Sequence, residues 1–453
     1  MTEAPPSPKR ARMEDNNPEY GALVEVANEV LRQFESSELN VLHAIKATLV
    51  RKSPFDAVEA GLRETLLAAA AKCGPEVDRA MGCMVGMAVA DAVGHMWEFQ
   101  PVVDQPFQSD KGFNLEEFRC VNKSNAFGLK MGQWTDDCSM GLCVADSLLF
   151  RRSFDGSDMR LRFWHWWNCG MNNAFRKDPS RSGSVGLGGN ISQSIYSIKP
   201  GVKYEPNVSP PPRYPETNAD AGNGSLMRNA AIPIFGLANE ELAMEIAREQ
   251  SYTTHPGPIA AEACALHTFL CVRAMKTEVT DPKAFMDEAA GLYLEKLAKW
   301  QKTAPDAAHE WAYDVLTRLL TSEEPDTSTE RCWNWKDANL DIQRTLVNRG
   351  RRYNGYPVSS GYFGSYSMDG LALALHSFYH TSSFDTCVVR CVNFLGDSDS
   401  HGAICAQIAG SFYGHAAIDS RFKGWIKEWD DDEIAMRAVL LHVVGKEANK
   451  TSA

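Results

Sequence analysis

One segment of the sequence, residues 82–98, reads GCMVGMAVADAVGHMWE. Glycine or alanine recurs there at every fourth position, at 82, 86, 90 and 94. On an α-helix this spacing places all four on one face, where a second helix can approach closely. The segment therefore predicts a core helix packed against another helix. Glu98 follows Gly94 by one turn, and for the segment taken alone a solvated terminal glutamate is the favoured interpretation.

Helical periodicity continues along most of the chain. It begins with apolar residues at positions 23, 26, 27, 30, 31 and 34, which fit the spacing of one helix face. Similar patterns occupy residues 56–73, 78–98, 137–151, 239–250, 257–275, 283–302, 306–321, 369–380, 384–394, 401–415 and 431–446. The alternation typical of strands is nearly absent, so we predict an all-α fold.

Three stretches lack this periodicity, namely residues 99–134, 176–222 and 347–366. Loops of such length inside a compact domain are usually functional or disordered. Two of them end directly before glycine-bearing or acidic motifs, which favours function. We divide the chain into a disordered tail (1–18), an N-terminal helical extension (19–75) and a main domain (76–448).

The composition excludes several classes of protein. Of the 453 residues, 44% are hydrophobic and 23% are charged, as in ordinary globular proteins. The net charge of −12 opposes binding to nucleic acid or anionic membranes, because both need a basic surface. No apolar run is long enough to span a membrane. The twelve cysteines form no CxxC pair, which favours reduced, buried thiols in an intracellular protein.

A short basic run lies near the N-terminus, at Lys9–Arg12. It is either a nuclear-import signal or part of a solvated, disordered tail. For so short a run the tail is the favoured interpretation. We therefore expect the protein in the cytoplasm, and also in the nucleus if the run is a working signal.

Two predicted helices begin with clustered acids beside a hydroxyl. Residues 135–137 read Thr-Asp-Asp, and residues 397–400 read Asp-Ser-Asp-Ser. Either cluster alone fits an ordinary helix start, since these residues cap N-termini and acids offset the helix dipole. One cap, however, needs only one side chain. Two clusters, each with two acids and a hydroxyl, favour a site for a hard divalent cation, which prefers oxygen ligands.

Three further motifs are weaker. Residues 222–228 read GNGSLMR; the glycines let backbone N–H groups approach a phosphate, although a plain turn is favoured for the motif alone. Arg228 either binds there or forms an internal salt bridge. His255, in Thr-His-Pro, fits a ligand contact and a structural histidine equally well. The acidic run Asp430–Glu433 is interpreted as a solvated helix N-terminus.

In this order, the motifs resemble the ADP-ribosylglycohydrolase family. The matching features are the glycine-rich helix leading to Glu98, TDD at 135–137, GNG and MR within 222–228, TH at 254–255, and GDSDS at 396–400. The resemblance covers residues 78–446. It implies a compact, orthogonally packed all-α bundle and a catalytic main domain. It also implies two bound divalent ions, Mg²⁺ or in some members Mn²⁺.

The resemblance assigns roles to individual residues. Glu98 would be the mobile catalytic carboxylate, with Asp136 or Asp137 as a second proton-transfer group. The metal ligands would be Thr135, Asp136, Asp137, Asp397, Asp399 and Ser400. ADP-ribose would be held by Glu98, Asp220, Ala221, Gly222, Asn223, Gly224, Ser225, Leu226 and His255, with Tyr366 stacking on adenine.

Three positions depart from the family pattern. Cys138 stands where the family usually has threonine, and Ala90 stands where it usually has glycine. His401 follows the second cluster where a small or hydroxyl residue is common. Cys138 and Ala90 replace no essential ligand in this scheme, whereas His401 can alter the surroundings of the ligands.

The function implied is cleavage of the bond between ADP-ribose and a modified protein side chain. Arginine is slightly favoured over serine as that side chain, because Asp-Ser-Asp-Ser resembles the arginine-specific branch. The alternatives are a catalytically silent ADP-ribose-binding or structural member, and a hydrolase of another ADP-ribose-like compound. Retention of Glu98 and all six ligand positions argues against silence. The expected partner is an ADP-ribosylated protein or peptide, not nucleic acid or membrane, and a monomer is expected.

Overall fold

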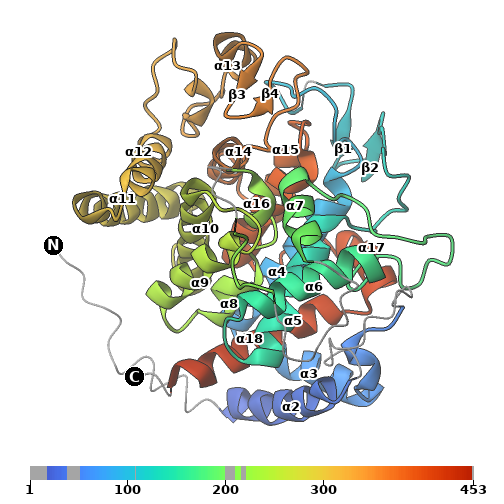
Figure 1. The fold of residues 1–453 in the computed structure, drawn as a ribbon. Coiled ribbons are helices and arrows are strands. Elements are labelled where there is room, and N and C mark those ends of the chain that lie inside the picture. The colour runs from blue at the N-terminus through green and yellow to red at the C-terminus, as the bar shows by residue number, and fades with distance from the viewer. Residues whose placement is uncertain (1–17, 38–50, 108, 199–209, 216–220, 451–453) are drawn as a thin grey trace.

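The computed structural model describes residues 18–37, 51–107, 109–198, 210–215 and 221–450 (Figure 1). The Lys9–Arg12 run, nearly all of the predicted tail and Asp220 lie outside these residues. The all-α prediction is confirmed. The helices are α2 (Pro18–Glu35), α3 (Ala60–Ala70), α4 (Pro75–Gly94), α5 (Asp136–Arg151), α6 (Gly156–Cys169), α7 (Gly189–Ser197), α8 (Ala231–Phe235), α9 (Glu240–Tyr252), α10 (Pro258–Lys276), α11 (Pro282–Trp300), α12 (Ala307–Thr321), α13 (Ile342–Arg349), α14 (Ser367–Tyr379), α15 (Phe384–Val392), α16 (Ser398–Tyr413), α17 (Ser420–Asp430) and α18 (Glu433–Lys450).

Short elements complete the described fold. Two small antiparallel hairpins are formed by β1 (Gly112–Asn114) with β2 (Arg119–Val121), and by β3 (Arg352–Tyr353) with β4 (Tyr356–Pro357). Single 3₁₀ turns are η2 (Pro54–Ala57), η3 (Asn223–Ser225), η4 (Gln301–Thr303) and η5 (Arg331–Trp333). Both hairpins fall in stretches without helical periodicity, and η3 directly follows another such stretch, residues 176–222.

The centre of the molecule is the close pair α4 and α16. A Cβ added at Gly82 would overlap the carbonyl of Gly410, and one added at Gly94 would lie 2.5 Å from the carbonyl oxygen of Ser398. Only glycine lets two helix backbones approach so closely. The predicted packing of the four-residue glycine–alanine spacing is therefore confirmed. It brings the C-terminal end of α4 against the first turn of α16.

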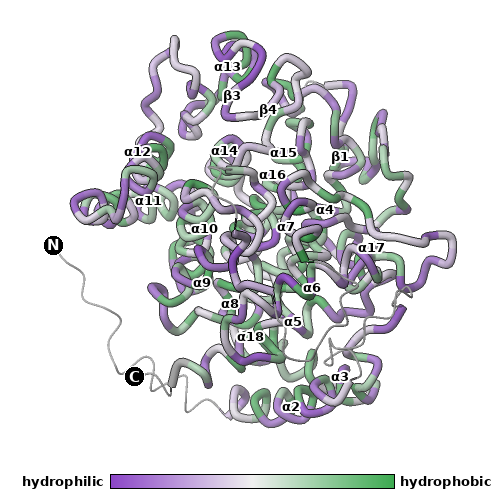
Figure 2. The backbone as a smooth tube through the Cα atoms, in the orientation of Figure 1, coloured by the Kyte–Doolittle hydropathy of each residue, from purple (hydrophilic) through white to green (hydrophobic). Residues whose placement is uncertain are grey.

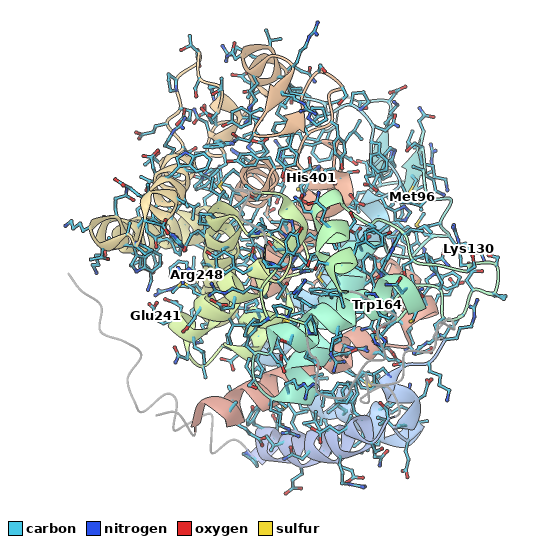
Figure 3. All side chains as sticks on the ribbon, viewed as in Figure 1. Met96, Lys130, Trp164, Glu241, Arg248 and His401 are labelled. Carbon is cyan, nitrogen blue, oxygen red and sulfur yellow. The ribbon has the colours of Figure 1, made fainter. Side chains whose placement is uncertain are left out.

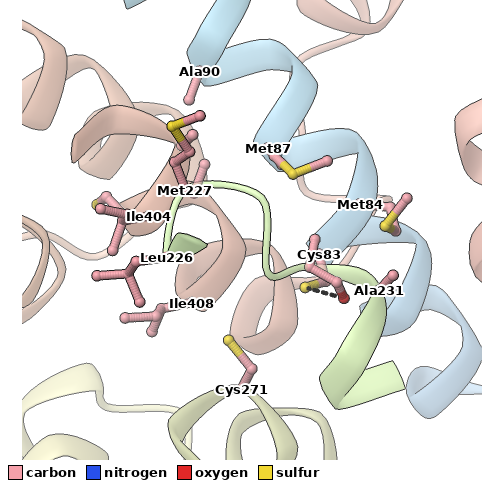
Figure 4. Packing of buried hydrophobic residues seen from close by; sticks show 14 of the residues in the cluster. Cys83, Met84, Met87, Ala90, Leu226, Met227, Ala231, Cys271, Ile404 and Ile408 are labelled. Carbon is pink, nitrogen blue, oxygen red and sulfur yellow. Dashed lines mark hydrogen bonds between the residues drawn. The ribbon is translucent and has the colours of Figure 1, made fainter. Parts of the chain in front are cut away.

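Other helices surround this pair. Figure 4 shows Met87 and Ala90 of α4 facing Leu226, Met227 and Ile404 across the core. Helices α5, α10 and α18 pack against α4, and α10, α14 and α15 pack against α16. In Figure 2, hydrophobic residues are most frequent in the segments near the middle of the molecule, and hydrophilic residues are most frequent in the outer loops. A rigid core thus holds the ends of α4, α5 and α16 in place.

The N-terminal helices lie apart from those ends. Helix α2 buries Leu23, Ala27, Val30, Leu31 and Phe34, the face that its periodicity predicted. It packs on α3 and α18, at the bottom of Figure 1. Within the part of the chain described, no helix is long and apolar enough to cross a membrane.

Two helix boundaries near the site differ from the prediction. Helix α4 ends at Gly94 instead of continuing to residue 98, because the backbone turns and Phe99 adopts φ +67°. Helix α16 begins at Ser398, three residues before the predicted start. Glu98 therefore lies on a turn after α4, and Asp399 lies inside the first turn of α16.

Five helices of the described chain were not predicted: α6, α7, α8, α13 and α17. Helix α6 carries Arg160 and Arg162 on its buried side, each 1% exposed. These charged residues interrupt the apolar face of the helix in the sequence. The Arg162 guanidinium is paired with Asp158 at 2.6 Å, which offsets the cost of burial. Hydropathy alone does not reveal a helix whose buried face carries paired charges.

The interpretation of Asp430–Glu433 as solvated is wrong for its two outer residues. Asp430 is 5% exposed and Glu433 is 3% exposed. Glu433 accepts hydrogen bonds from Arg176 and from Ser53 of the N-terminal extension. The reason is a network of distant partners that the local sequence does not show.

Candidate active site

Two helix starts and one helix end meet at one place. Asp136 and Asp137 occupy the first turn of α5, and Asp399 and Ser400 the first turn of α16. Glu98 comes from the turn after α4. Figure 3 labels Met96 and His401, which flank these segments in the chain. The structure therefore brings both predicted acidic clusters and Glu98 together.

The two residues expected to cap these helices do not do so. Thr135 and Asp397 stand at the N-cap positions of α5 and α16, and neither side chain makes a capping hydrogen bond. The Thr135 hydroxyl instead donates to the carboxylate of Asp91 at 2.8 Å. Ordinary capping therefore does not explain either cluster, and the side-chain oxygens face a shared interior.

Carboxylate oxygens gather in two overlapping groups. One oxygen each from Asp91, Asp137 and Asp399 lie within 4.8 Å of one another, and so do oxygens from Glu98, Asp397 and Asp399. Asp399 belongs to both groups. Two neighbouring sets of oxygen donors with a shared carboxylate suit a pair of hard divalent cations.

Asp91 is a residue of this site that no sequence motif singles out. Besides the Thr135 hydroxyl, this carboxylate accepts hydrogen bonds from the backbone N–H groups of Thr135 at 2.8 Å and Cys138 at 2.9 Å. It thus supplies from α4 the cap that α5 lacks. The available signal was a lone aspartate inside an apolar helix, since a buried carboxylate needs a partner.

The site holds six buried carboxyl groups, those of Asp91, Glu98, Asp136, Asp137, Asp397 and Asp399. Each is less than a tenth exposed, and none forms an ion pair with a lysine or arginine of the described chain. Burial and mutual repulsion raise the pKa of Asp136, Asp137 and Glu98 well above the ordinary range. The same causes raise the pKa of Asp399 to about 8. Such a cluster calls for bound cations or bound protons.

Two of these groups also have unused oxygens. Glu98 Oε2 and Asp137 Oδ1 are buried and have no hydrogen-bond partner. Buried polar atoms without partners are rare in native proteins and are expected to meet a ligand, ion or water. The residues present therefore fit divalent metal ions on chemistry, burial and unsatisfied oxygens alike.

The glycine motif lies against the same cluster. Asn223 Nδ2 donates to Asp397 Oδ2 at 2.8 Å and to the Gly364 carbonyl at 3.1 Å. The backbone of Gly222 pairs with that of Tyr366, and Asn223 N–H donates to the Ser365 carbonyl at 2.9 Å. The structure thus joins the predicted substrate loop to the metal-ligand segment and to the 347–366 stretch.

His255 faces the two glycines of that loop. A Cβ added at Gly224 would lie 2.9 Å from His255 Cε1, and one added at Gly222 would lie 3.3 Å from its Nε2. At Gly222 the added carbon would also meet Tyr356 Oη at 3.0 Å and Asn190 Nδ2 at 3.2 Å. Three polar side chains therefore converge on Gly222, and a larger residue there would crowd all three. Burial lowers the pKa of His255 to about 3, so its ring is neutral.

The remaining predicted substrate residues are deeply placed. Ser225 and Leu226 are fully buried, and Ser225 Oγ lies 2.8 Å from Ser251 Oγ. Ala221 contributes its carbonyl to the N–H of Ser367. Tyr366 is 2% exposed and enclosed by the rings of Trp333, Tyr353 and Tyr356, so its stacking on adenine stays a prediction.

Arg228 does not form the internal salt bridge considered from sequence. It is fully buried and donates to Gln250, Thr253 and Thr254, all neutral. Its guanidinium lies 4.4 Å from the centre of the Phe163 ring. Arg228 thus connects the end of the glycine loop to residues 250–254 through hydrogen bonds.

The long loop before α7 also reaches the site. Gly186 adopts φ +91°, and a Cβ there would overlap Asp136 Oδ1. The chain therefore needs glycine at this position, both for its conformation and for its close approach. The expectation that the 176–222 stretch is functional agrees with this contact.

Comparison with known proteins gives a consistent result. A family model described as ADP-ribosylglycohydrolase matches residues 74–449. The ADP-ribosylarginine hydrolase Tri1 of Serratia proteamaculans is 25% identical over 352 residues, which are 77% of this chain and 75% of that protein. The ADP-ribosyl-[dinitrogen reductase] glycohydrolase of Rhodospirillum rubrum is 25% identical over 366 residues, 79% of this chain and 92% of that protein.

Two further comparisons, one of sequence and one of structure, give similar proteins. The ADP-ribosylhydrolase ARH3 of Gallus gallus is 21% identical over 375 residues, 78% of this chain and 89% of that protein. A solved structure titled ADP-ribosylglycohydrolase-related protein complex superposes with a TM-score of 0.52 at 23% identity, over 82% of this chain and 99% of the other. The family model spans most of the chain, and the chain belongs to the ADP-ribosylglycohydrolase family.

Proposed function

We propose that the chain is a divalent-metal-dependent hydrolase that releases ADP-ribose from a modified arginine side chain of a protein or peptide. One observation carries the proposal. A family member retains, in a buried site, six carboxylates that no lysine or arginine of the described chain neutralises. A structural protein would gain nothing from such a cluster, because burying unpaired charge is costly.

The residues of the site fit two hard cations, and we propose Mg²⁺, with Mn²⁺ as a substitute. The ligands would be Thr135, Asp136, Asp137, Asp397, Asp399 and Ser400, and we add Asp91. The Thr135 hydroxyl gives its proton to Asp91, which leaves its oxygen lone pairs available to a metal. Bound Mg²⁺ would orient the ribose hydroxyls and activate a water molecule for attack.

Carboxyl groups of the chain itself donate and accept the protons that hydrolysis requires. Hydrolysis breaks the bond between the anomeric carbon of the distal ribose and the arginine nitrogen; water oxygen bonds to that carbon, and the leaving nitrogen takes up a proton. Burial raises the pKa of Glu98, with Asp399 and Asp397 adding to the rise, so the group is suited to hold a proton and donate it. Asp136 or Asp137 can accept the proton of the water.

The glycine loop and its neighbours are suited to the phosphates and ribose. Gly222 and Gly224 allow close backbone approach, and neutral His255, Tyr356 and Asn190 offer hydrogen-bonding groups beside them. Backbone and neutral donors recognise a diphosphate without adding charge. This arrangement also explains how a chain of net charge −12 accepts an anionic ligand.

Two observations support arginine as the acceptor. Relatives from two bacteria are named ADP-ribosylarginine hydrolase, and the acidic site favours a cationic side chain. The alternatives remain a hydrolase of another ADP-ribose-like compound and a silent binding protein. We further propose a monomer located in the cytoplasm, with Lys9–Arg12 deciding any entry into the nucleus.

The test is direct. The purified protein with Mg²⁺ is incubated with arginine- and serine-ADP-ribosylated peptides, and free ADP-ribose is measured. The proposal expects release from the arginine peptide, loss of release in Asp399→Asn, and retention in Asp314→Asn, which changes an exposed aspartate of α12. Release from the serine peptide only would show that the acceptor is serine and not arginine. Release from neither, with ADP-ribose still bound, would support the silent protein.

A further inference from the structure

Three aromatic side chains form a cluster around Phe99, the residue after Glu98: Phe99 itself, Phe127 and Tyr362, here called the aromatic rim. The Phe99 ring stacks on Tyr362, with centroids 5.6 Å apart and planes 29° apart. It meets Phe127 edge-on at 5.9 Å. The Phe99 side chain is nevertheless 53% exposed. A large apolar ring next to a catalytic carboxylate, half open to solvent, is available to a ligand.

The backbone holds this ring in place. Phe99 adopts φ +67°, a conformation that residues with a Cβ rarely take. Its N–H donates to the Gly396 carbonyl at 3.1 Å, and the Gly396 N–H donates to the Gln100 carbonyl at 3.0 Å. Consecutive side chains therefore meet different neighbours: Glu98 interacts with Asp399, while Phe99 meets the rim. The exposed ring is fixed to the metal-ligand segment rather than carried by a free loop.

Tyr362 connects the rim to the carboxylate cluster. Its ring supports Phe99, and its phenol interacts with the carboxylate of Asp397. A group bound on the open face of Phe99 would therefore lie near the acidic cluster.

The charge of the site selects the kind of group. With Glu98 holding its proton, the other five carboxylates still exceed the four positive charges of two divalent ions, so the filled site attracts a further cation. The nearby cations have other partners: Lys111 Nζ donates to Gln100 Oε1 at 2.8 Å, and Arg181 Nη2 to the Phe127 carbonyl at 2.8 Å. A guanidinium is planar, stacks on aromatic faces and donates several hydrogen bonds to carboxylates at once.

We propose that the aromatic rim is the subsite for the acceptor side chain, and that stacking on Phe99 selects an arginine guanidinium over a serine. The inference rests on the proposed hydrolase function and adds to it the residue that reads the acceptor. A serine linkage has neither the positive charge nor the flat surface that this ring recognises.

The test compares three variants of the full-length protein loaded with Mg²⁺. Phe99→Leu keeps an apolar side chain and removes the π face, whereas Phe99→Tyr keeps that face. Phe107→Leu is the matched control, because Phe107 is 60% exposed and lies beside Arg390, outside the rim. For each variant, kcat and KM are measured on arginine- and serine-ADP-ribosylated peptides, and ADP-ribose affinity is measured by calorimetry.

The expected result is a rise of about 2- to 30-fold in KM for the arginine peptide in Phe99→Leu, the range of a lost cation–π contact. The kcat value, the ADP-ribose affinity and the KM of any serine cleavage stay unchanged, and Phe99→Tyr and Phe107→Leu behave as wild type. If the wild type cleaves the arginine peptide and Phe99→Leu has no effect, the proposed acceptor subsite is wrong and the proposed hydrolase function is retained. Equal loss on both peptides would also overturn the proposed subsite, and an inactive wild type would overturn both proposals.

Discussion

Asp91 of α4 holds Thr135 at the start of α5: its Oδ1 accepts hydrogen bonds from the Thr135 N–H and hydroxyl, each at 2.8 Å. Its other oxygen accepts from the Cys138 N–H. One carboxylate thus caps a neighbouring helix and orients a predicted metal ligand. Because α4 is also locked to α16 through glycine contacts, all three helix ends are positioned by one rigid unit before any ligand binds.

Asp91→Asn tests this relationship. The amide still accepts from Thr135, but its NH₂ group opposes the Cys138 N–H and one negative charge is lost. We expect the affinity for Mn²⁺, titrated calorimetrically, to fall by about 10- to 100-fold, as for other groups that orient metal ligands. Circular dichroism should show an unchanged helical content. Asp314→Asn serves as the control; equal metal affinity in both variants would refute a role for Asp91.

The metal-free protein should lose stability as pH rises. In the folded chain the pKa of Asp399 is about 8 and that of Asp91 about 6, whereas aspartate in an unfolded chain has a pKa of about 3.9. Between about pH 4 and pH 8 the folded state therefore binds more protons, and stability falls with rising pH.

Thermal unfolding in chelator at pH 5.5 and pH 8 measures this effect. Saturating Mg²⁺ should remove most of the fall at pH 8, since the metal takes the place of the protons. Asp399→Asn should show a shallower fall in chelator than the wild type. A stability that is flat or rises between these pH values, or that Mg²⁺ leaves unchanged, contradicts the metal site.

The glycine contacts between α4 and α16 predict a large difference between two similar substitutions. A Cβ at Gly410 would overlap the backbone carbonyl of Gly82, which cannot move aside as a flexible side chain can. We expect Gly410→Ala to destabilise the protein by about 3 kcal/mol. Gly424 of α17 has no atom within 4 Å of an added Cβ, so Gly424→Ala should be neutral or stabilising by up to about 1 kcal/mol. Urea unfolding compares the two.

The features that depend on residues close together in the sequence could be predicted from it. The spacing from Gly82 to Gly94 predicted a close helix pair, and the paired acids with hydroxyls at 135–137 and 397–400 predicted one site. The features that could not be predicted depend on contacts between residues far apart in the sequence. Asp91 has no acidic neighbour in sequence, and the aromatic rim joins three separate loops. Asp430 was misjudged because its burial depends on residues far away along the chain.

Helix ends show the same limit. Glu98 was predicted one turn beyond Gly94 on a continuous helix, yet α4 ends at Gly94. The Met96 carbonyl there accepts hydrogen bonds from the N–H groups of Ser124 and Asn125 instead of from a following helical turn, and no residue between the two positions is a strong helix breaker. A pattern of small residues predicts a helix face but not where tertiary contacts end the helix.

Glu98→Gln separates proton transfer from metal binding. The side chain keeps its shape, but it no longer titrates and no longer supplies an acid. Six residues are carried over as metal ligands and Glu98 is not among them, so metal and ADP-ribose affinities should change by less than about fivefold, while kcat falls by about 10²- to 10⁴-fold, the usual range for a lost general acid. Asp399→Asn should instead lose metal binding, because Asp399 belongs to both carboxylate groups. If Glu98→Gln weakened metal binding as much as Asp399→Asn does, Glu98 would be a ligand rather than the proton donor. An unchanged kcat would remove it from the chemistry.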